Sequence, residues 1–183
     1  MKSQRIVNIV IFAALIGLCV AGRLLPHSAN FTPVAAAGLF AGFFFRSRLA
    51  ALAVPMLGML LSDAVIGGYE WPMMLAVYGA FASCVLLGRL LKPRLTALRA
   101  AGLGLGGAVV FFLGSNLATW FVYYERSVEG LLVCYTAALP FFRTKLAGDM
   151  TWTAIIFGCY VLATQAAGHL AARRKTLRPL PLV

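Results

Sequence analysis

Residues 100–124 read AAGLGLGGAVVFFLGSNLATWFVYY, a run of 25 residues without a charged side chain. An α-helix rises about 1.5 Å per residue, so about 20 apolar residues cross the roughly 30 Å hydrocarbon core of a bilayer. The run also contains several glycines, which allow helices to approach closely inside a membrane. This stretch therefore predicts a membrane-spanning helix that packs against other helices.

The rest of the chain has the same apolar character. Hydrophobic residues make up 62% of the 183 residues and charged residues 11%, with a mean hydropathy of +0.90. Soluble domains contain about 45–50% apolar and about 25% charged residues. The composition excludes a soluble enzyme, a disordered chain and a disulfide-rich secreted scaffold. The formal net charge of +11 is explained by basic loops that set membrane topology, so no nucleic-acid partner is expected.

Six stretches have the hydropathy of membrane helices, so the predicted fold is an all-α six-helix bundle that forms a single transmembrane domain over residues 1–183. The predicted spans are 6–25, 32–45, 49–67, 72–91, 100–124 and 150–172. Residues 130–142 are apolar but too few for a span, and Pro140 lies near the end of this segment, which favours a short interfacial helix between the fifth and sixth spans.

The basic residues predict how the bundle lies in the membrane. With the N-terminus inside, twelve of the 16 Lys and Arg residues fall on the cytoplasmic side, and all five acidic residues fall at the outer ends. Lys and Arg collect in cytoplasmic loops, so both termini are predicted to be cytoplasmic. The outer connections are polar and aromatic, and a ligand site would therefore face outward.

Four polar residues near these outer ends are candidates for a site. Asp63 lies within an apolar helix, where an acid is costly unless it faces a cavity or pairs with a cation such as Arg23 or Arg143. His27 lies in a loop that Pro26 and Pro33 stiffen. Tyr78 in the fourth span and Asn116 in the fifth add groups that form hydrogen bonds.

Two further patterns are informative. Phe141, Phe142, Arg143, Lys145 and Asp149 form an aromatic and charged cluster after Pro140, which we place on the outer face. Ala13, Gly17 and Ala21 form a stripe of small residues on the first helix, which faces either another helix of this protein or a partner subunit.

No motif for catalysis is present in the sequence. A nucleophile beside a base, a phosphate-binding loop and the metalloprotease patterns are all missing. We therefore expect the protein not to be an enzyme, to hold no cofactor of its own and to lack a nucleotide site that could power transport.

The segment 23–36, RLLPHSANFTPVAA, resembles the signature of small bacterial six-helix membrane proteins related to the S components of energy-coupling factor vitamin transporters. Further similar stretches are LSD at 61–63, LGRLL at 87–91, ALPFFR at 138–143 and GD at 148–149. The best-understood type that the chain resembles is a solitary transporter of cobalamin (vitamin B12). The resemblance implies a multi-pass protein of the bacterial cytoplasmic (inner) membrane.

The resemblance also implies roles for particular residues. A corrinoid would occupy an outward-facing cavity, and the substrate-binding candidates are His27, Asn30, Asp63, Tyr78, Asn116 and Arg143. In that type, a cysteine thiolate from the region after the acid of the third span can ligate cobalt. The corresponding residues here, 71–78, contain no cysteine. His27 and Cys84 are therefore the candidate cobalt ligands, with His27 placed first because neutral imidazole suits transition metals.

Three functions follow as expectations. The first is uptake of cobalamin or a related corrinoid, the transported ligand. The second is an S component for another small vitamin that docks on a shared energy-coupling transmembrane module. The third is a membrane assembly protein that does not transport.

Overall fold

The computed structural model describes residues 2–26 and 28–176, and all regular structure in this part of the chain is helical. The elements are α1 (Lys2–Leu24), α2 (Val34–Phe44), α3 (Arg48–Ile66), α4 (Trp71–Arg89), α5 (Ala97–Tyr123) and α6 (Val128–Thr176). The all-α prediction is confirmed. Helix starts match local chemistry: the side chains of Ser47 and Thr96 cap α3 and α5 by accepting hydrogen bonds of 3.2 Å from backbone N–H groups.

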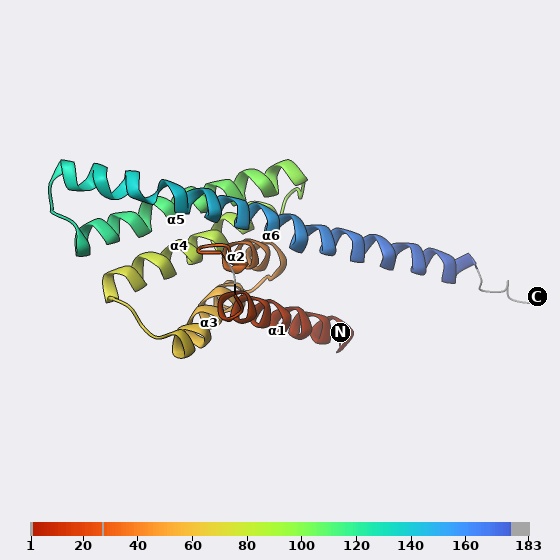
Figure 1. The fold of residues 1–183 in the computed structure, drawn as a ribbon. Helices are drawn as coiled ribbons and strands as arrows, with labels where there is room; N and C mark the ends of the chain where they lie inside the picture. The colour runs from red at the N-terminus through yellow and green to blue at the C-terminus, as the bar shows by residue number, and fades with distance from the viewer. Residues whose placement is uncertain (1, 27, 177–183) are drawn as a thin grey trace, which may run out of the picture.

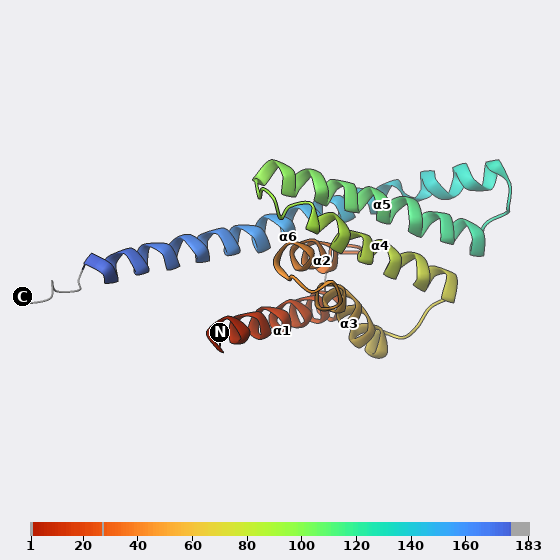
Figure 2. The ribbon, with the colours of Figure 1, turned by 180° about the vertical axis from the view of Figure 1, so that it is seen from behind.

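Helix α2 lies at the centre of the molecule. It contacts all five other helices, and every residue from Val34 to Gly42 is buried. Figures 1 and 2 show α4, α5 and α6 on one side of α2, and α1 and α3 on the other. The predicted helix at 32–45 is thus present, but its 11 residues cover only about 16 Å, which is too short to cross a bilayer alone.

Glycines let α2 and α4 cross at very short range. A Cβ atom added to Gly88 would lie 1.9 Å from the Leu39 carbonyl oxygen, and one added to Gly42 would lie 2.0 Å from that of Val85. Only hydrogen fits at both positions, so each helix presents a glycine to the backbone of the other.

Five helices are long and apolar enough to cross a membrane: α1, α3, α4, α5 and α6, counted over the described residues. The sequence therefore predicted the membrane class correctly. Many large apolar side chains are exposed on their outer faces, as expected where lipid replaces water.

The prediction of a separate helix at 130–142 is wrong, because this segment is joined to the last predicted span without a break. Residues 128–176 form one continuous helix of 49 residues with Pro140 inside it. Proline is tolerated within membrane helices because neighbouring groups compensate for its missing N–H. At about 1.5 Å per residue α6 is about 74 Å long, and its C-terminal part extends beyond the other helices (Figures 1 and 2).

Both termini of the described chain lie toward the same end of the molecule, together with the α4–α5 connection (Figure 1). The α3–α4 and α5–α6 connections lie at the opposite end. Basic residues gather at the first of these ends. Lys92 Nζ donates to the Phe45 carbonyl oxygen at 2.7 Å, and partial burial with the nearby charges of Arg89 and Arg46 lowers the pKa of Lys92. The membrane face that each end adopts stays a prediction.

The small-residue stripe of α1 lies on the surface. Ala13, Gly17 and Ala21 are exposed, and no atom lies within 4 Å of where a Gly17 Cβ would be. The prediction that this stripe packs against another helix of the protein is therefore wrong for the described residues. Docking on a partner subunit stays a prediction.

Candidate functional site

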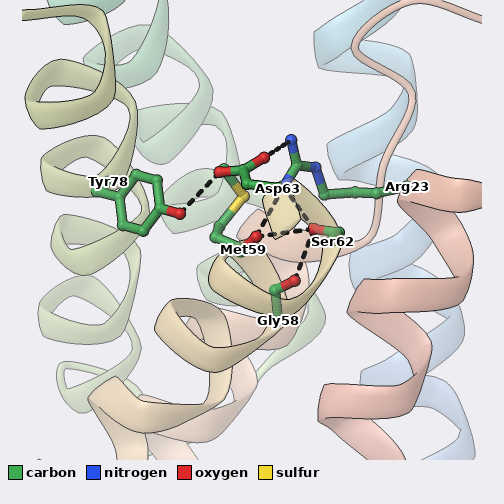
Figure 3. Close-up of polar contacts among 6 residues, drawn as sticks. All are labelled: Arg23, Gly58, Met59, Ser62, Asp63 and Tyr78. Carbon is green, nitrogen blue, oxygen red and sulfur yellow. Dashed lines mark hydrogen bonds and ion pairs between the residues drawn. The ribbon is translucent and has the colours of Figure 1, made fainter. Parts of the chain in front are cut away.

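Two of the predicted site residues, Asp63 and Tyr78, meet in one polar cluster near the ends of α1 and α3. The Asp63 carboxylate lies 2.7 Å from Arg23 Nη2 through Oδ1, and accepts a 2.7 Å hydrogen bond from the Tyr78 hydroxyl through Oδ2. Figure 3 shows the three side chains converging from α1, α3 and α4. The sequence left open whether Asp63 faces a cavity or pairs with a cation. It pairs with Arg23.

The neighbouring groups complete this cluster. The Arg23 guanidinium also donates to Ser62 Oγ and to the Met59 carbonyl oxygen, and Ser62 Oγ in turn donates to the carbonyl oxygen of Gly58 at 2.7 Å (Figure 3). Burial, with a smaller contribution from the Asp63 charge, raises the pKa of Tyr69 in the α3–α4 connection. The cluster joins three helices through the Arg23–Asp63 ion pair and the hydrogen bond from Tyr78.

A separate cavity lies between α4, α5 and α6. Its volume is about 340 Å³, within the usual range of about 300–1,000 Å³ for ligand pockets. It extends from Asn30 and Tyr124 at the loop end to Lys145 on α6. Its other lining residues are apolar, aromatic or small polar ones: Met73, Val77, Phe111, Phe112, Ser115, Asn116, Thr119, Cys134, Ala137, Ala138, Phe141 and Phe142.

Two predicted binding residues, Asn30 and Asn116, line this cavity. Asn30 has a positive φ of 64°, a left-handed conformation that asparagine adopts more readily than most residues. Asn116 Nδ2 donates to the Phe112 carbonyl oxygen at 2.7 Å, which leaves the oxygen of its side chain as an acceptor. These two amides come from distant parts of the sequence.

Lys145 and Asp149 are the charged residues nearest the inner end of the cavity, and they were not among the predicted binding residues. Lys145 Nζ donates to Asp149 Oδ2 one turn further along α6. The two side chains are 2% and 1% exposed. The sequence placed both in an outer cluster because 130–142 was interpreted as a separate helix. The continuous α6 instead places them inside the bundle.

The remaining predicted residues lie elsewhere. His27 is outside the described residues. Arg143 is exposed on α6 and does not line the cavity. Cys84 is buried in α4, donates to the Ala80 carbonyl oxygen at 3.4 Å and faces Gly107 of α5. Neither Cys84, a candidate cobalt ligand, nor Arg143, a candidate binding residue, therefore lines the cavity.

Two other hollows lie away from these polar groups. One of about 760 Å³ lies among α1, α2 and α6 near the N-terminal end, with Arg5 and Arg46 on its wall. The other, of about 560 Å³, lies between α5 and α6 and is almost wholly apolar. The cavity beside Lys145 is the smallest of the three, yet it alone combines aromatic walls with a buried charge among the described residues.

Fold and cavity together define an all-helical protein with several helices fit to cross a membrane and a small, polar-ended pocket between three of them. The chain belongs to the family of unknown function DUF6580, which matches residues 3–172. No curated protein and no solved structure matches the chain.

Proposed function

We propose that this protein binds a molecule of the size of a small vitamin in the cavity between α4, α5 and α6, and takes part in its uptake across the membrane. The observation that carries the proposal is the cavity itself. Its aromatic and aliphatic walls suit an apolar ring or chain, while Asn30, Asn116 and Lys145 supply the few polar groups that orient a ligand.

The cavity volume orders the candidate ligands. A small vitamin fits entirely within about 340 Å³, whereas a corrinoid is much larger and would have to displace the outer connections. We therefore place the small-vitamin function before cobalamin uptake. Transport would depend on an ion gradient or an energy-coupling partner, because the sequence contains no phosphate-binding loop.

A calorimetric screen of the purified protein in detergent tests this function. The panel is thiamine, riboflavin, nicotinate, biotin, pantothenate and cyanocobalamin. We expect one small member to bind, and Ala137→Trp, which fills the cavity, to weaken its binding at least tenfold. Leu139→Trp is the matched control, because Leu139 is two residues away on α6, 51% exposed and not part of the cavity wall.

The possible results separate the alternatives. Binding of cyanocobalamin alone would favour cobalamin uptake over the small-vitamin function. Binding that Ala137→Trp leaves unchanged would place the site elsewhere, and absence of binding by every member would contradict the proposed function.

A further inference from the structure

Lys145 lies at mid-depth in the bundle. It is 17 residues into α6, about 26 Å from the start of the helix. Its Nζ atom is 4.8 Å from the centroid of the Phe111 ring, near the middle of α5, and 5.7 Å from that of Phe81 on α4. A lysine held at this depth is costly, and ionisable residues inside membrane segments usually serve a binding or transport site.

The hydrogen-bonding groups of the Lys145–Asp149 pair are only partly used. A lysine ammonium has three N–H donors, and the one hydrogen bond recorded for Lys145 within residues 2–26 and 28–176 goes to Asp149 Oδ2. Within the same residues, Asp149 Oδ1 is buried and has no hydrogen-bond partner. A buried ion pair is stabilising only when its remaining donors and acceptors are also satisfied, so this pair by itself is incomplete.

The residue that carries the unused donors borders the cavity. Lys145 lines it, whereas Asp149 does not. A molecule in the cavity therefore reaches the ammonium and not the carboxylate. The group that satisfies N–H donors on a cation best is an anionic oxygen, because charge-assisted hydrogen bonds are roughly twice as strong as neutral ones.

We propose that the ligand of this cavity carries a carboxylate, which Lys145 Nζ binds while Asp149 positions the lysine. The inference rests on the proposed function and adds the chemical class of the ligand. The apolar part of the ligand would contact Phe111 and Phe112, and the carboxylate would lie at the inner end of the cavity. Arg143, the cation among the binding residues that the resemblance implies, is exposed outside the cavity.

Matched pairs of acids and neutral analogues test this class of ligand. The pairs are nicotinate and nicotinamide, pantothenate and pantothenol, and biotin and biotinamide, each measured by calorimetry on the full-length protein in detergent. We expect the acid of at least one pair to bind roughly thirty-fold more tightly than its neutral analogue, as for a buried hydrogen-bonded charge pair.

Variants of Lys145 test whether this residue causes the preference for the acid over its neutral analogue. Lys145→Gln should remove it, so that acid and analogue bind equally, and Lys145→Arg should retain part of it. Arg143→Gln, on the same helix but outside the cavity, should leave it unchanged. Thermal unfolding of each variant identifies any that fail to fold. If Lys145→Gln fails, Lys145→Arg is the test, and a preference as large as that of the unmodified protein would contradict the role of Lys145.

The outcomes distinguish this inference from the proposed function. If a neutral analogue binds as well as its acid, or the preference survives Lys145→Gln, the carboxylate class is wrong and the cavity function stands. If neither member of any pair binds the unmodified protein and the vitamin panel also fails, both are overturned.

Discussion

Asp63 is held through both of its carboxylate oxygens, by Arg23 from α1 and by Tyr78 from α4. An acid in an apolar helix has two explanations in a sequence, ligand binding or internal pairing, and the distance of 2.7 Å to Arg23 decides for pairing. The buried acid that the sequence drew attention to thus has partners within the protein, and its predicted role in ligand binding stays a prediction. The charge that reaches the cavity belongs to Lys145.

This assignment predicts that Asp63→Ala destabilises the fold. The Asp63 and Arg23 side chains are 7% and 15% exposed, and removing one partner of a buried ion pair costs about 3–5 kcal/mol. We expect the free energy of unfolding in mixed detergent and SDS micelles to fall by about 3 kcal/mol.

Glu125→Ala serves as the control, because Glu125 is exposed in the α5–α6 connection and its loss should change stability by less than about 0.5 kcal/mol. If Asp63→Ala were as stable as this control, the ion pair would make no net contribution.

At the scale of elements, α2 and α4 are held together by contact between their backbones. Gly88 meets the Leu39 carbonyl group and Gly42 meets that of Val85. Without a difference in apolarity between protein and lipid, helices in membranes associate largely through such close packing. The crossing fixes α4 against the central helix, and α4 supplies Met73 and Val77 to the cavity wall.

Gly88→Ala is therefore expected to be strongly destabilising. The added methyl group would lie 1.9 Å from the Leu39 oxygen, a backbone atom that cannot move without separating the helices. Overpacking of this kind costs about 1–3 kcal/mol, and we expect the upper part of that range in an SDS unfolding titration.

The same helix provides a matched control. No atom lies within 4 Å of where a Gly79 Cβ would be, so Gly79→Ala adds a good helix former in open space and should leave stability unchanged or raise it by up to about 1 kcal/mol. Equal effects of the two substitutions would show that α2 and α4 do not cross so closely.

Helix α6 shows how one element changes the meaning of a sequence pattern. The stretch after Pro140 has an acid and a base four residues apart, a spacing that places them on one face of a helix. With a break assumed near Pro140, the two charges belong to a loop at the outer surface. With α6 continuous, both lie inside the bundle, and Lys145 lines the cavity.

For the whole molecule, the arrangement of connections separates two ends. The chain ends and the α4–α5 connection lie toward one end, and the α3–α4 and α5–α6 connections lie at the other (Figure 1). Since Lys and Arg favour the cytoplasmic side, the end that carries Arg46, Arg89 and Lys92 is expected to be cytoplasmic.

Cysteine labelling on intact cells tests this orientation, in a Cys159→Ser background that removes the exposed native thiol. We expect a membrane-impermeant maleimide to label Arg126→Cys from outside. Gln4→Cys and Arg94→Cys should react only after the cells are permeabilised. The reverse pattern would invert the topology, and equal labelling of all three would contradict the two-ended arrangement.

Hydropathy and charge, which are local properties of the sequence, determined the helical membrane class, the approximate helix boundaries and the expected grouping of basic residues. Five of the six predicted spans have helices long and apolar enough to cross a membrane, because about 20 apolar residues in a row leave the backbone no alternative to a helix in lipid. Asn30 and Asn116 were also identified from the sequence, and both line the cavity.

Only the tertiary structure decided which charge meets which, because pairing depends on how helices far apart in the sequence pack together. Arg23 and Asp63 are 40 positions apart and come together through the contact between α1 and α3. Lys145 reaches the cavity because α6 continues through Pro140 and packs beside α5. Hydropathy records how apolar each residue is, but it carries no information about the neighbour that a side chain will face, so the position of the cavity could not be read from the sequence.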